Sequence, residues 1–133
     1  MSYLIDTDIV IYSIKGNNIV QNHFMQNENI PKAISIITYG ELLYGAKKSK
    51  NIEKNLAVVY RIKELFPIIT IDKAVIETFS DIKVSMQKAG NLLDDMDLLI
   101  ASTAMTMNFI LVTNNEKHFS RIKGLKVENW NKE

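Results

Sequence analysis

Acidic residues stand out in this sequence because they recur inside or beside segments that are otherwise built for a hydrophobic core. Asp6 and Asp8 close the apolar stretch 3–5, and Glu41 lies within the apolar stretch 36–43. A third group, directly before the apolar stretch 98–101, consists of Asp94, Asp95 and Asp97. Carboxylates in such places are costly unless a cation meets them. Two of them about 4 Å apart repel by about 4 kcal/mol at an effective dielectric constant near 20, so a shared divalent cation is the simplest explanation.

The metal that such a site would take follows from the residue types that the chain lacks. There are no cysteines, and the two histidines, His23 and His118, do not have the spacing of a zinc site. We expect His118 to be a surface or packing residue rather than a general base. Any metal must therefore be held by oxygen ligands, and this favours Mg²⁺ or Mn²⁺.

Length and composition limit the architecture to one domain. The 133 residues, 47% of them hydrophobic, suffice for one compact domain with its own core, which we assign to 1–133. No apolar run approaches the ~20 residues of a membrane span, and no signal sequence opens the chain, so we expect a cytoplasmic protein. The net charge of +1 neither marks nor excludes a nucleic-acid binder, because a local basic patch decides that. One such cluster consists of Lys47, Lys48, Lys50 and Lys54.

Short β-branched runs alternate with longer stretches of helical period, which is typical of an α/β domain with a mostly parallel sheet. The predicted strands lie at about 2–5, 33–36, 68–71, 109–112 and 126–129. The predicted helices lie near 8–15, 18–27, 38–48, 52–65, 73–90 and 95–107, with a short helical turn at 115–119.

This arrangement predicts that the acids converge. Asp6 and Asp8 follow the first strand, and the polar segment 113–115 follows the fourth. The carboxyl edge of a parallel sheet is where ligands bind, and Asp97 opens the helix that leads to the fourth strand. Glu41 shares one helical face with apolar neighbours, so it must lie at the rim of that face or meet a partner.

Structural roles compete with this interpretation at several positions. Asp6 or Asp8 could cap the helix near residue 9, and capping is the better explanation for Asp94. Glu41 has no capping role in the middle of a helix, although a rim salt bridge would suffice for it. Thr113 could be a turn hydroxyl or a hydrogen-bond donor behind a metal ligand. Side chains expected to fill the core include Trp130, Met86, Met96, Met105 and Met107.

The helices predicted at 8–27 and 38–65 carry more apolar residues than a small core easily buries. The residues that we expect to be exposed are Tyr12, Ile14, Phe24, Leu43, Tyr44, Leu56 and Val59. A groove between these helices would accommodate an amphipathic helix of a partner protein.

Five segments in register resemble PIN-domain proteins of the VapC toxin type over essentially the whole chain. They are Tyr-Leu-Ile-Asp-Thr-Asp-Ile-Val-Ile-Tyr at 3–12, Ile-Ser-Ile-Ile-Thr-Tyr-Gly-Glu-Leu-Leu-Tyr-Gly-Ala at 34–46, Asp-Met-Asp-Leu-Leu-Ile-Ala-Ser at 95–102, Leu-Val-Thr-Asn-Asn-Glu-Lys-His-Phe at 111–119 and Gly-Leu-Lys-Val-Glu-Asn-Trp at 124–130. The resemblance implies a three-layer α/β/α sandwich and a Mg²⁺- or Mn²⁺-dependent endoribonuclease that cleaves a structured RNA such as tRNA or rRNA. It also implies a VapB-type antitoxin as partner, and a homodimer.

The resemblance further implies roles for single residues. The family's three catalytic acids fall on Asp6, Glu41 and Asp97, of which the first and last hold the metal. Asp95 matches an additional acid found in many members and would be a further metal ligand. Asn115, at a position where the family often has Asp, would be a weaker ligand, often acting through water. Asp8 replaces the usual Asn, and it would either restore part of that charge or, together with Thr113, support the ligands from behind. The lysines at 47–54 would bind the RNA backbone.

Two other classes of protein stay open on the residues alone. The segment Leu-Ile-Asp-Thr-Asp also resembles the nucleophile motif of haloacid-dehalogenase-type phosphatases, with Asp94 and Asp95 as their late acidic pair and Thr70 as the hydroxyl motif. That class requires the late acids to follow a strand and gives Glu41 no role. A non-catalytic RNA- or protein-binding domain with a structural cation is the other alternative. Mg²⁺-dependent RNA cleavage, compared with phosphate release from a small ester, separates all three.

Overall fold

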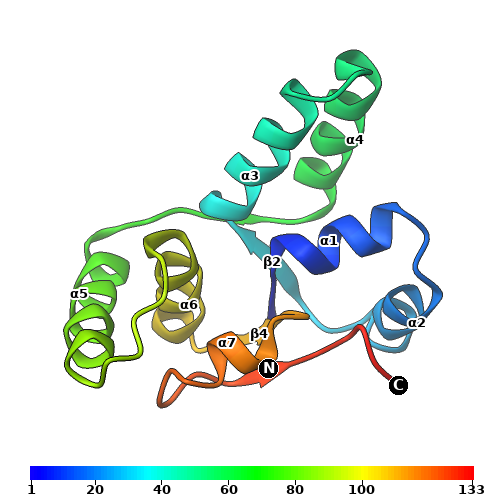
Figure 1. Ribbon diagram of the computed structural model, residues 1–133. Coiled ribbons are helices and arrows are strands. Elements are labelled where there is room, and N and C mark those ends of the chain that lie inside the picture. The colour runs from blue at the N-terminus through cyan, green and yellow to red at the C-terminus, as the bar shows by residue number, and fades with distance from the viewer.

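A five-stranded, entirely parallel sheet forms the centre of the computed structural model, which describes residues 1–133 (Figure 1). The strands lie in the order β3-β2-β1-β4-β5, and all four neighbouring pairs are parallel. Their bounds are β1 Tyr3–Ile5, β2 Lys32–Ser35, β3 Ile68–Ile69, β4 Ile110–Val112 and β5 Val127–Glu128. Because β4 pairs with β1, the first and last thirds of the chain meet in the middle of the sheet.

Seven helices surround this sheet. Their bounds are α1 Thr7–Ile14, α2 Asn18–Gln26, α3 Ile36–Lys47, α4 Ile52–Leu65, α5 Lys73–Lys88, α6 Asp95–Met107 and α7 Glu116–Phe119. Figure 1 shows α5 and α6 side by side at one end of the molecule, α1 and α2 at the other, and the α3–α4 pair standing out from the body. This is the three-layer α/β/α arrangement that the family resemblance implies.

Polar caps explain where most helices begin. The side chains of Asn17, Ser35, Asn51 and Asp72 accept hydrogen bonds from backbone N–H groups three residues further on. Such bonds satisfy donors that have no partner within the helix. Helix α6 ends at Asn108, whose φ of 55° places it in the left-handed conformation that commonly terminates a helix.

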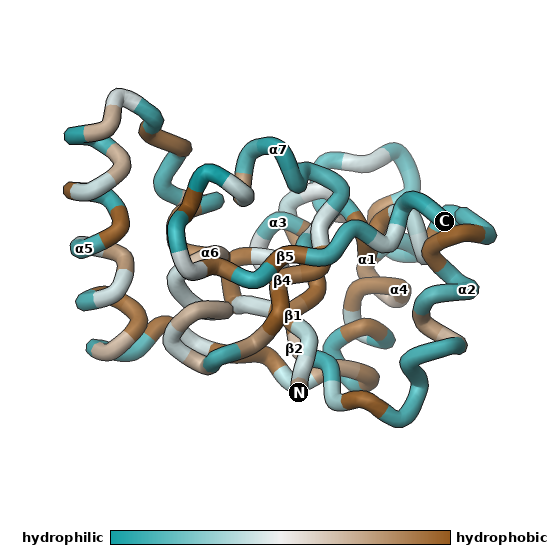
Figure 2. The backbone as a smooth tube through the Cα atoms, turned by 90° about the horizontal axis from the view of Figure 1, so that it is seen from below, coloured by the Kyte–Doolittle hydropathy of each residue, from teal (hydrophilic) through white to brown (hydrophobic).

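Alternation along the strands divides the core into two clusters, one on each face of the sheet. Leu4 and Leu111 face the cluster under α5, α6 and α7, whereas Ile5 and Val112 face the cluster under α1 to α4. Figure 2 shows the hydrophobic strands enclosed by more polar helices. Trp130 is buried in the second cluster and contacts Tyr3 and Phe24 edge to face.

The predicted bounds agree with the observed ones within a few residues, and the sheet is wholly rather than mostly parallel. Met86 and Trp130 are buried as expected, but Met96 and Met107 are exposed, so their assignment to the core was wrong. Val59, which was expected to be exposed, is buried against α3 and the sheet. No helix combines the length and the apolar character needed to cross a membrane.

Candidate functional site

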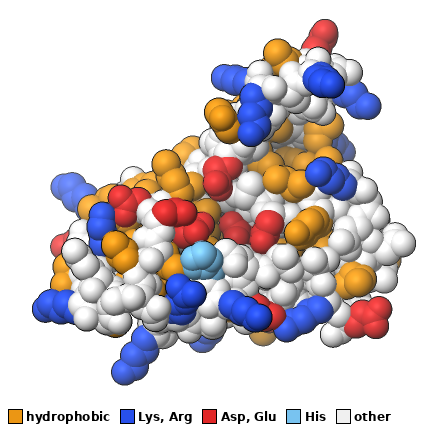
Figure 3. Space-filling model, viewed as in Figure 1, with side chains coloured by type: hydrophobic (Ala, Val, Ile, Leu, Met, Phe, Trp, Pro, Cys, Tyr) orange, Lys and Arg blue, Asp and Glu red, His pale blue; other side chains and the backbone are white.

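The carboxyl ends of β1 and β4 bring the sequence-predicted acids to one edge of the sheet. Ile5 and Val112 are register partners, so the residues that follow them, Asp6 and Thr113, leave adjacent strands together. On the face shown in Figure 3, acidic side chains gather in the hollow between the projecting α3–α4 pair and the body of the molecule. The sheet topology thus creates the cluster from residues far apart in sequence.

Asp6 lies at the centre of this cluster and is only 7% exposed. Its Oδ1 accepts a hydrogen bond from the backbone N–H of Thr7 at 2.8 Å, and its Oδ2 accepts one from the hydroxyl of Thr113, also at 2.8 Å. Asp6 occupies the cap position of α1, but a normal capping bond comes from a backbone N–H two or three residues on. The side chain is therefore not a simple helix cap.

Asp8 connects α1 to the segment after β4. Its Oδ1 accepts from the backbone N–H of Ile9 at 2.7 Å, and its Oδ2 accepts from the backbone N–H of Asn114 at 3.1 Å. The hydroxyl of Thr113 lies 3.5 Å from the same Oδ2. Asp8 and Thr113 are thus held against Asp6 and the backbone after β4, and a supporting role for them behind a metal ligand stays a prediction.

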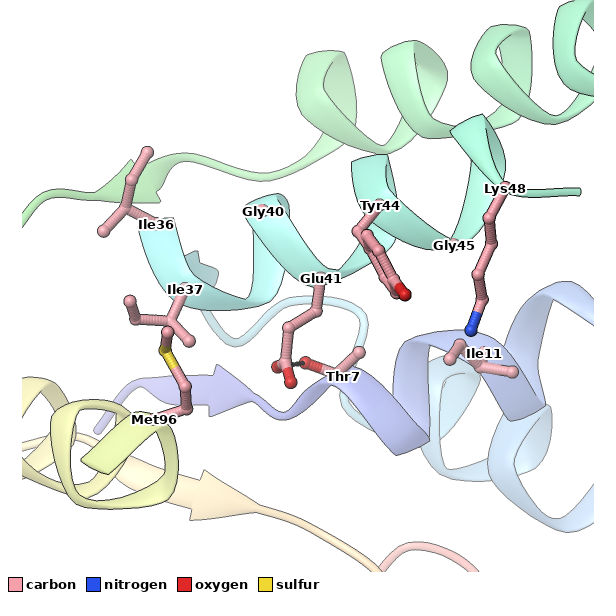
Figure 4. A pocket seen from close by; sticks show the side chains of 10 residues that line it. All are labelled: Thr7, Ile11, Ile36, Ile37, Gly40, Glu41, Tyr44, Gly45, Lys48 and Met96. Carbon is pink, nitrogen blue, oxygen red and sulfur yellow. Dashed lines mark hydrogen bonds between the residues drawn. The ribbon is translucent and has the colours of Figure 1, made fainter. Parts of the chain in front are cut away.

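Glu41 reaches the cluster from α3. It is exposed, and its Oε1 accepts a 2.7 Å hydrogen bond from the hydroxyl of Thr7, the residue that follows Asp6 (Figure 4). No ion pair involves Glu41. The alternative of a rim salt bridge for this residue is therefore wrong.

The acids at the start of α6 have different roles. Asp94 caps the helix, because its Oδ1 accepts from the backbone N–H of Asp97 at 3.0 Å, as expected for a cap. Asp95 forms a 3.0 Å ion pair with Lys83 of α5, which engages it on the outside of the cluster. Asp97 is half-buried and close enough to Glu41 and Asp6 for their charges to interact. The late acids of a phosphatase would follow a strand, whereas these open a helix.

Asn115 and His118 border the cluster from α7. The side-chain nitrogen of Asn115 lies 3.0 Å from Nδ1 of His118, and its backbone N–H donates to the hydroxyl of Thr113 at 3.0 Å. His118 is half-buried, and its charge acts on Asp97 and lowers the pKa of that carboxyl. His118 therefore lies beside the acids, closer to the candidate site than the sequence suggested.

Burial and mutual repulsion raise the pKa values of three carboxyls. The pKa of Asp6 rises to about 7, chiefly through burial and then through the charge of Asp8. Burial likewise raises the pKa of Asp8, although the hydrogen bond from the backbone of Asn114 opposes this. The pKa of Asp97 rises to about 6 through burial and the charge of Asp94. Each of these carboxylates is stabilised when a cation approaches.

The residues present fit a hard divalent cation. None of the three ion pairs in the chain involves Asp6, Asp8, Glu41 or Asp97, and the nearby charge of His118 acts on Asp97 without forming an ion pair with it. No group of three or more acidic or histidine side chains lies close enough together to hold an ion on its own. The expectation that Asp6, Glu41 and Asp97 lie within bridging distance of one another is therefore not met. Carboxylate oxygens from one or two residues, completed by water and phosphate, are the usual ligands of Mg²⁺.

A groove runs from the acids along α3. Figure 4 shows Ile37 and Met96 at one end, Glu41 in the middle, and Tyr44 and then Lys48 toward the other end. The Nζ of Lys48 lies 4.8 Å from the centre of the Tyr44 ring. Of the four lysines in the predicted basic cluster, all exposed, only Lys48 lines this groove.

Sequence reasoning missed the hydroxyl groups that connect the acids. Thr7 stands between Asp6 and Asp8, and Thr38 precedes Glu41 by three residues on the same helical face. The two hydroxyls lie 3.0 Å apart. Their positions beside the acids were the available signal, but neither residue belongs to a periodic pattern that would have drawn attention to it.

The fold and this acidic edge define a PIN domain, and residues 3–125 match the family model described as the PIN domain. The chain is similar to "Ribonuclease VapC2" of Haemophilus influenzae, with 37% identity over 98% of each chain. It is 33% identical to "tRNA(fMet)-specific endonuclease VapC" of Shigella flexneri, again over 98% of both. Its structure resembles a chain in the crystal structure of VapBC2 from Rickettsia felis bound to a DNA fragment from the promoter. The TM-score is 0.92 and the sequence identity 35%, and the match covers 98% of this chain and 99% of that one. The chain therefore belongs to the PIN-domain family and, within it, to the VapC ribonucleases.

Proposed function

We propose that this protein is a divalent-metal-dependent endoribonuclease and the toxin of a VapBC-type toxin–antitoxin pair. The observation that carries this proposal is the cluster of Asp6, Glu41 and Asp97, none of which forms an ion pair within the chain. The substrate we propose is a structured RNA such as tRNA or rRNA, supported by the similarity to the tRNA(fMet)-specific endonuclease VapC of Shigella flexneri. A structural cation alone would not require a carboxylate such as Glu41, exposed in an open groove.

Asp6 and Asp97 would hold Mg²⁺ or Mn²⁺, with Asn115 in reach of its water ligands. Asp95 is the weakest of the candidate ligands because Lys83 engages it. A bound divalent ion lowers the pKa of water and neutralises charge that develops on the phosphate. Glu41, exposed and anchored through one oxygen, would accept a proton from the attacking water. Thr113 would keep Asp6 oriented through its 2.8 Å hydrogen bond.

The decisive experiment is incubation of purified protein with total tRNA and rRNA in Mg²⁺, in Mn²⁺ and in chelator. Internal cleavage of RNA that requires the metal supports the proposal. Release of phosphate from a small ester without RNA cleavage would instead support the phosphatase alternative. Binding of RNA without cleavage under any metal would support the non-catalytic one.

We predict that Lys48 contributes more to RNA binding than the other lysines of its cluster. It lies two helical turns, about 10 Å, beyond Glu41 on the groove-lining face of α3. A Lys48→Ala variant should raise the KM for RNA several-fold and reduce the slope of log affinity against log salt by about 1. Lys54→Ala is the matched control, because Lys54 is exposed but does not line the groove. Equal effects of the two substitutions would contradict this assignment.

The antitoxin surface that we propose is the apolar hollow between α1, α3 and α4. Ile11, Ile14 and Val58 line it, and it adjoins the groove that contains Glu41. Orange side chains fill this hollow in Figure 3. An amphipathic helix seated there would cover the entrance to the acids. The homodimer remains a prediction, which sedimentation at tens of micromolar protein would test.

An Ile14→Glu substitution should weaken binding of a VapB-type antitoxin by at least about tenfold, because it buries a charge in the apolar contact. RNA cleavage should be unchanged, since Ile14 is the last residue of α1 and lies at the end of that helix away from Asp6 and Asp8. The control is Ile76→Glu on α5, because Ile14 and Ile76 are 44% and 45% exposed. Calorimetric titration with the antitoxin measures the affinity of both variants. Equal loss in both variants would argue against the hollow as the binding surface.

A further inference from the structure

The side chain of Glu41 has one hydrogen-bond partner in the protein, the hydroxyl of Thr7. The Oγ1 of Thr7 donates to Oε1 of Glu41 at 2.7 Å, which connects the first residue of α1 to the middle of α3. A glutamate side chain that is exposed and unpaired samples many rotamers, and ordering it costs conformational entropy. The Thr7 hydroxyl therefore selects one position of this carboxylate before substrate arrives.

Counting protons fixes the direction of this hydrogen bond. A carboxylate only accepts, and a threonine hydroxyl has one proton, so the proton of Thr7 is committed to Glu41. The hydroxyl of Thr38 lies 3.0 Å from that of Thr7 and must then act as the donor between them. Ser35 Oγ lies 3.3 Å from Thr38 Oγ1 and donates to it in turn. Three hydroxyls thus point their protons in series from the core toward Glu41.

Burial keeps this series in place. Ser35 and Thr38 have no exposed surface, so water cannot replace either hydroxyl. Ser35 caps α3, and its Oγ accepts from the backbone N–H of Thr38 at 3.0 Å, which holds it at the start of the series. Ser35, the last residue of β2, is therefore both the cap of α3 and the first hydroxyl of the series.

Thr7 also binds the other acid. Its backbone N–H donates to Oδ1 of Asp6 at 2.8 Å while its hydroxyl donates to Glu41. One residue thus sets the separation between two carboxylates that come from different elements. Only Oε1 of Glu41 is used, which leaves Oε2 free to face the solvent or substrate.

We propose that Thr7 is a positioning residue for the cleavage reaction: it holds the Glu41 carboxylate at a fixed distance from Asp6, and the buried hydroxyls of Thr38 and Ser35 keep its proton directed at Glu41. This inference rests on the proposed function, in which Glu41 assists the attacking water. It assigns a role in RNA cleavage to a hydroxyl that would touch neither the metal nor the RNA.

The test compares Thr7→Val, which removes the hydroxyl at nearly constant shape, with Thr7→Ser, which retains it. Thr7→Val should lower kcat for Mg²⁺-dependent RNA cleavage by about 10- to 100-fold, as is typical when a supporting partner is lost, and leave KM within about twofold. Thr7→Ser should restore kcat to within a few-fold of the wild type. In a Glu41→Gln background, Thr7→Val should cause no further loss, because the group that it positions has already been changed.

A second measurement does not depend on cleavage. Calorimetric titration with Mn²⁺ in the absence of RNA should show affinity weakened several-fold by Thr7→Val in the wild-type background, because a Glu41 carboxylate fixed near Asp6 and Asp97 adds to their attraction for the ion. In the Glu41→Gln background, Thr7→Val should leave this affinity unchanged. Thr7→Val should lower the melting temperature in chelator modestly, because the buried Thr38 hydroxyl loses its acceptor, whereas Thr7→Ser should leave it close to that of the wild type.

Three outcomes would overturn the role of Thr7: wild-type kcat in Thr7→Val, an equal loss in Thr7→Ser, or the same loss with and without Glu41. Failure of the wild-type protein to cleave any RNA would overturn the proposed function instead. In that case the Mn²⁺ titration still decides the inference, because unchanged affinity in Thr7→Val would exclude positioning of Glu41 by this hydroxyl.

Discussion

An Asp6→Asn variant is expected to lose Mg²⁺-dependent RNA cleavage by about a thousandfold or more, while its stability in chelator equals or exceeds that of the wild type. In the proposed function Asp6 is a charged metal ligand, whose loss would remove several kcal/mol of transition-state stabilisation, and each 1.4 kcal/mol is about tenfold in rate. Stability should not suffer, because the substitution removes a buried charge whose pKa is raised by burial and by Asp8.

The hydrogen bonds around Asp6 can adapt to an amide. The Oδ1 of the new side chain can accept from the backbone N–H of Thr7, as Asp6 does now. Its amide nitrogen can donate to the hydroxyl of Thr113, which then turns its proton toward Asp8, 3.5 Å away. Asp81→Asn is the control, because Asp81 is exposed on α5. The measurements are a cleavage assay in Mg²⁺ and a melting curve in chelator, and full cleavage by Asp6→Asn would remove Asp6 from the active site.

Stability in chelator is expected to fall as the pH rises from about 4 to about 7. The carboxyls of Asp6 and Asp97 have pKa values of about 7 and about 6 in the folded chain, against an ordinary value of 3.8. Between these values the native state holds protons that the unfolded chain has lost, so the free energy of unfolding decreases with pH and then levels off. For Asp6 alone the shift corresponds to a loss on the order of 4 kcal/mol.

Metal should reverse this dependence. An ion that binds only the folded chain stabilises it by an amount that grows with concentration, and it binds the ionised carboxylates that prevail at high pH. Denaturant titrations at several pH values, with chelator and with excess Mg²⁺, measure both effects. In the Asp6→Asn variant, the free energy of unfolding measured in chelator should depend much less on pH. A wild-type protein that grows more stable from pH 4 to pH 7 in chelator would contradict the assignment of buried, uncompensated carboxyls.

Patterns of residues predicted the sheet and the location of the acids well. β-Branched runs and stretches of helical periodicity predicted the order of the strands and helices, because each strand must present apolar residues to helices on both faces of the sheet. The placement of Asp6 followed from the end of β1 alone. Glu41 was recognised because a charge in an apolar helical stretch has few structural explanations.

Details that depend on packing could not be derived in this way. The sequence does not show that Asp95 turns toward Lys83, since that contact depends on how α5 packs against α6. Met96 resembles a core residue by type, yet it lies exposed at the rim of the groove. The hydroxyl of Thr7 gained its partner only once α3 was placed beside α1. To predict each of these contacts, one must know how close two helices lie to each other, and composition and periodicity do not give that distance.

The position of β4 next to β1 also has a consequence for synthesis of the protein. Asp6 and Glu41 leave the ribosome early, but the edge they share is incomplete until α6 and β4 have been made and β4 has paired with β1. At about 5–20 residues per second, translation from Glu41 to Asp97 takes several seconds. During that interval the nascent chain carries only two of the three acids that the proposed function requires. Such a chain would be unable to cleave RNA, and a partner protein would have this time to meet it before it matures.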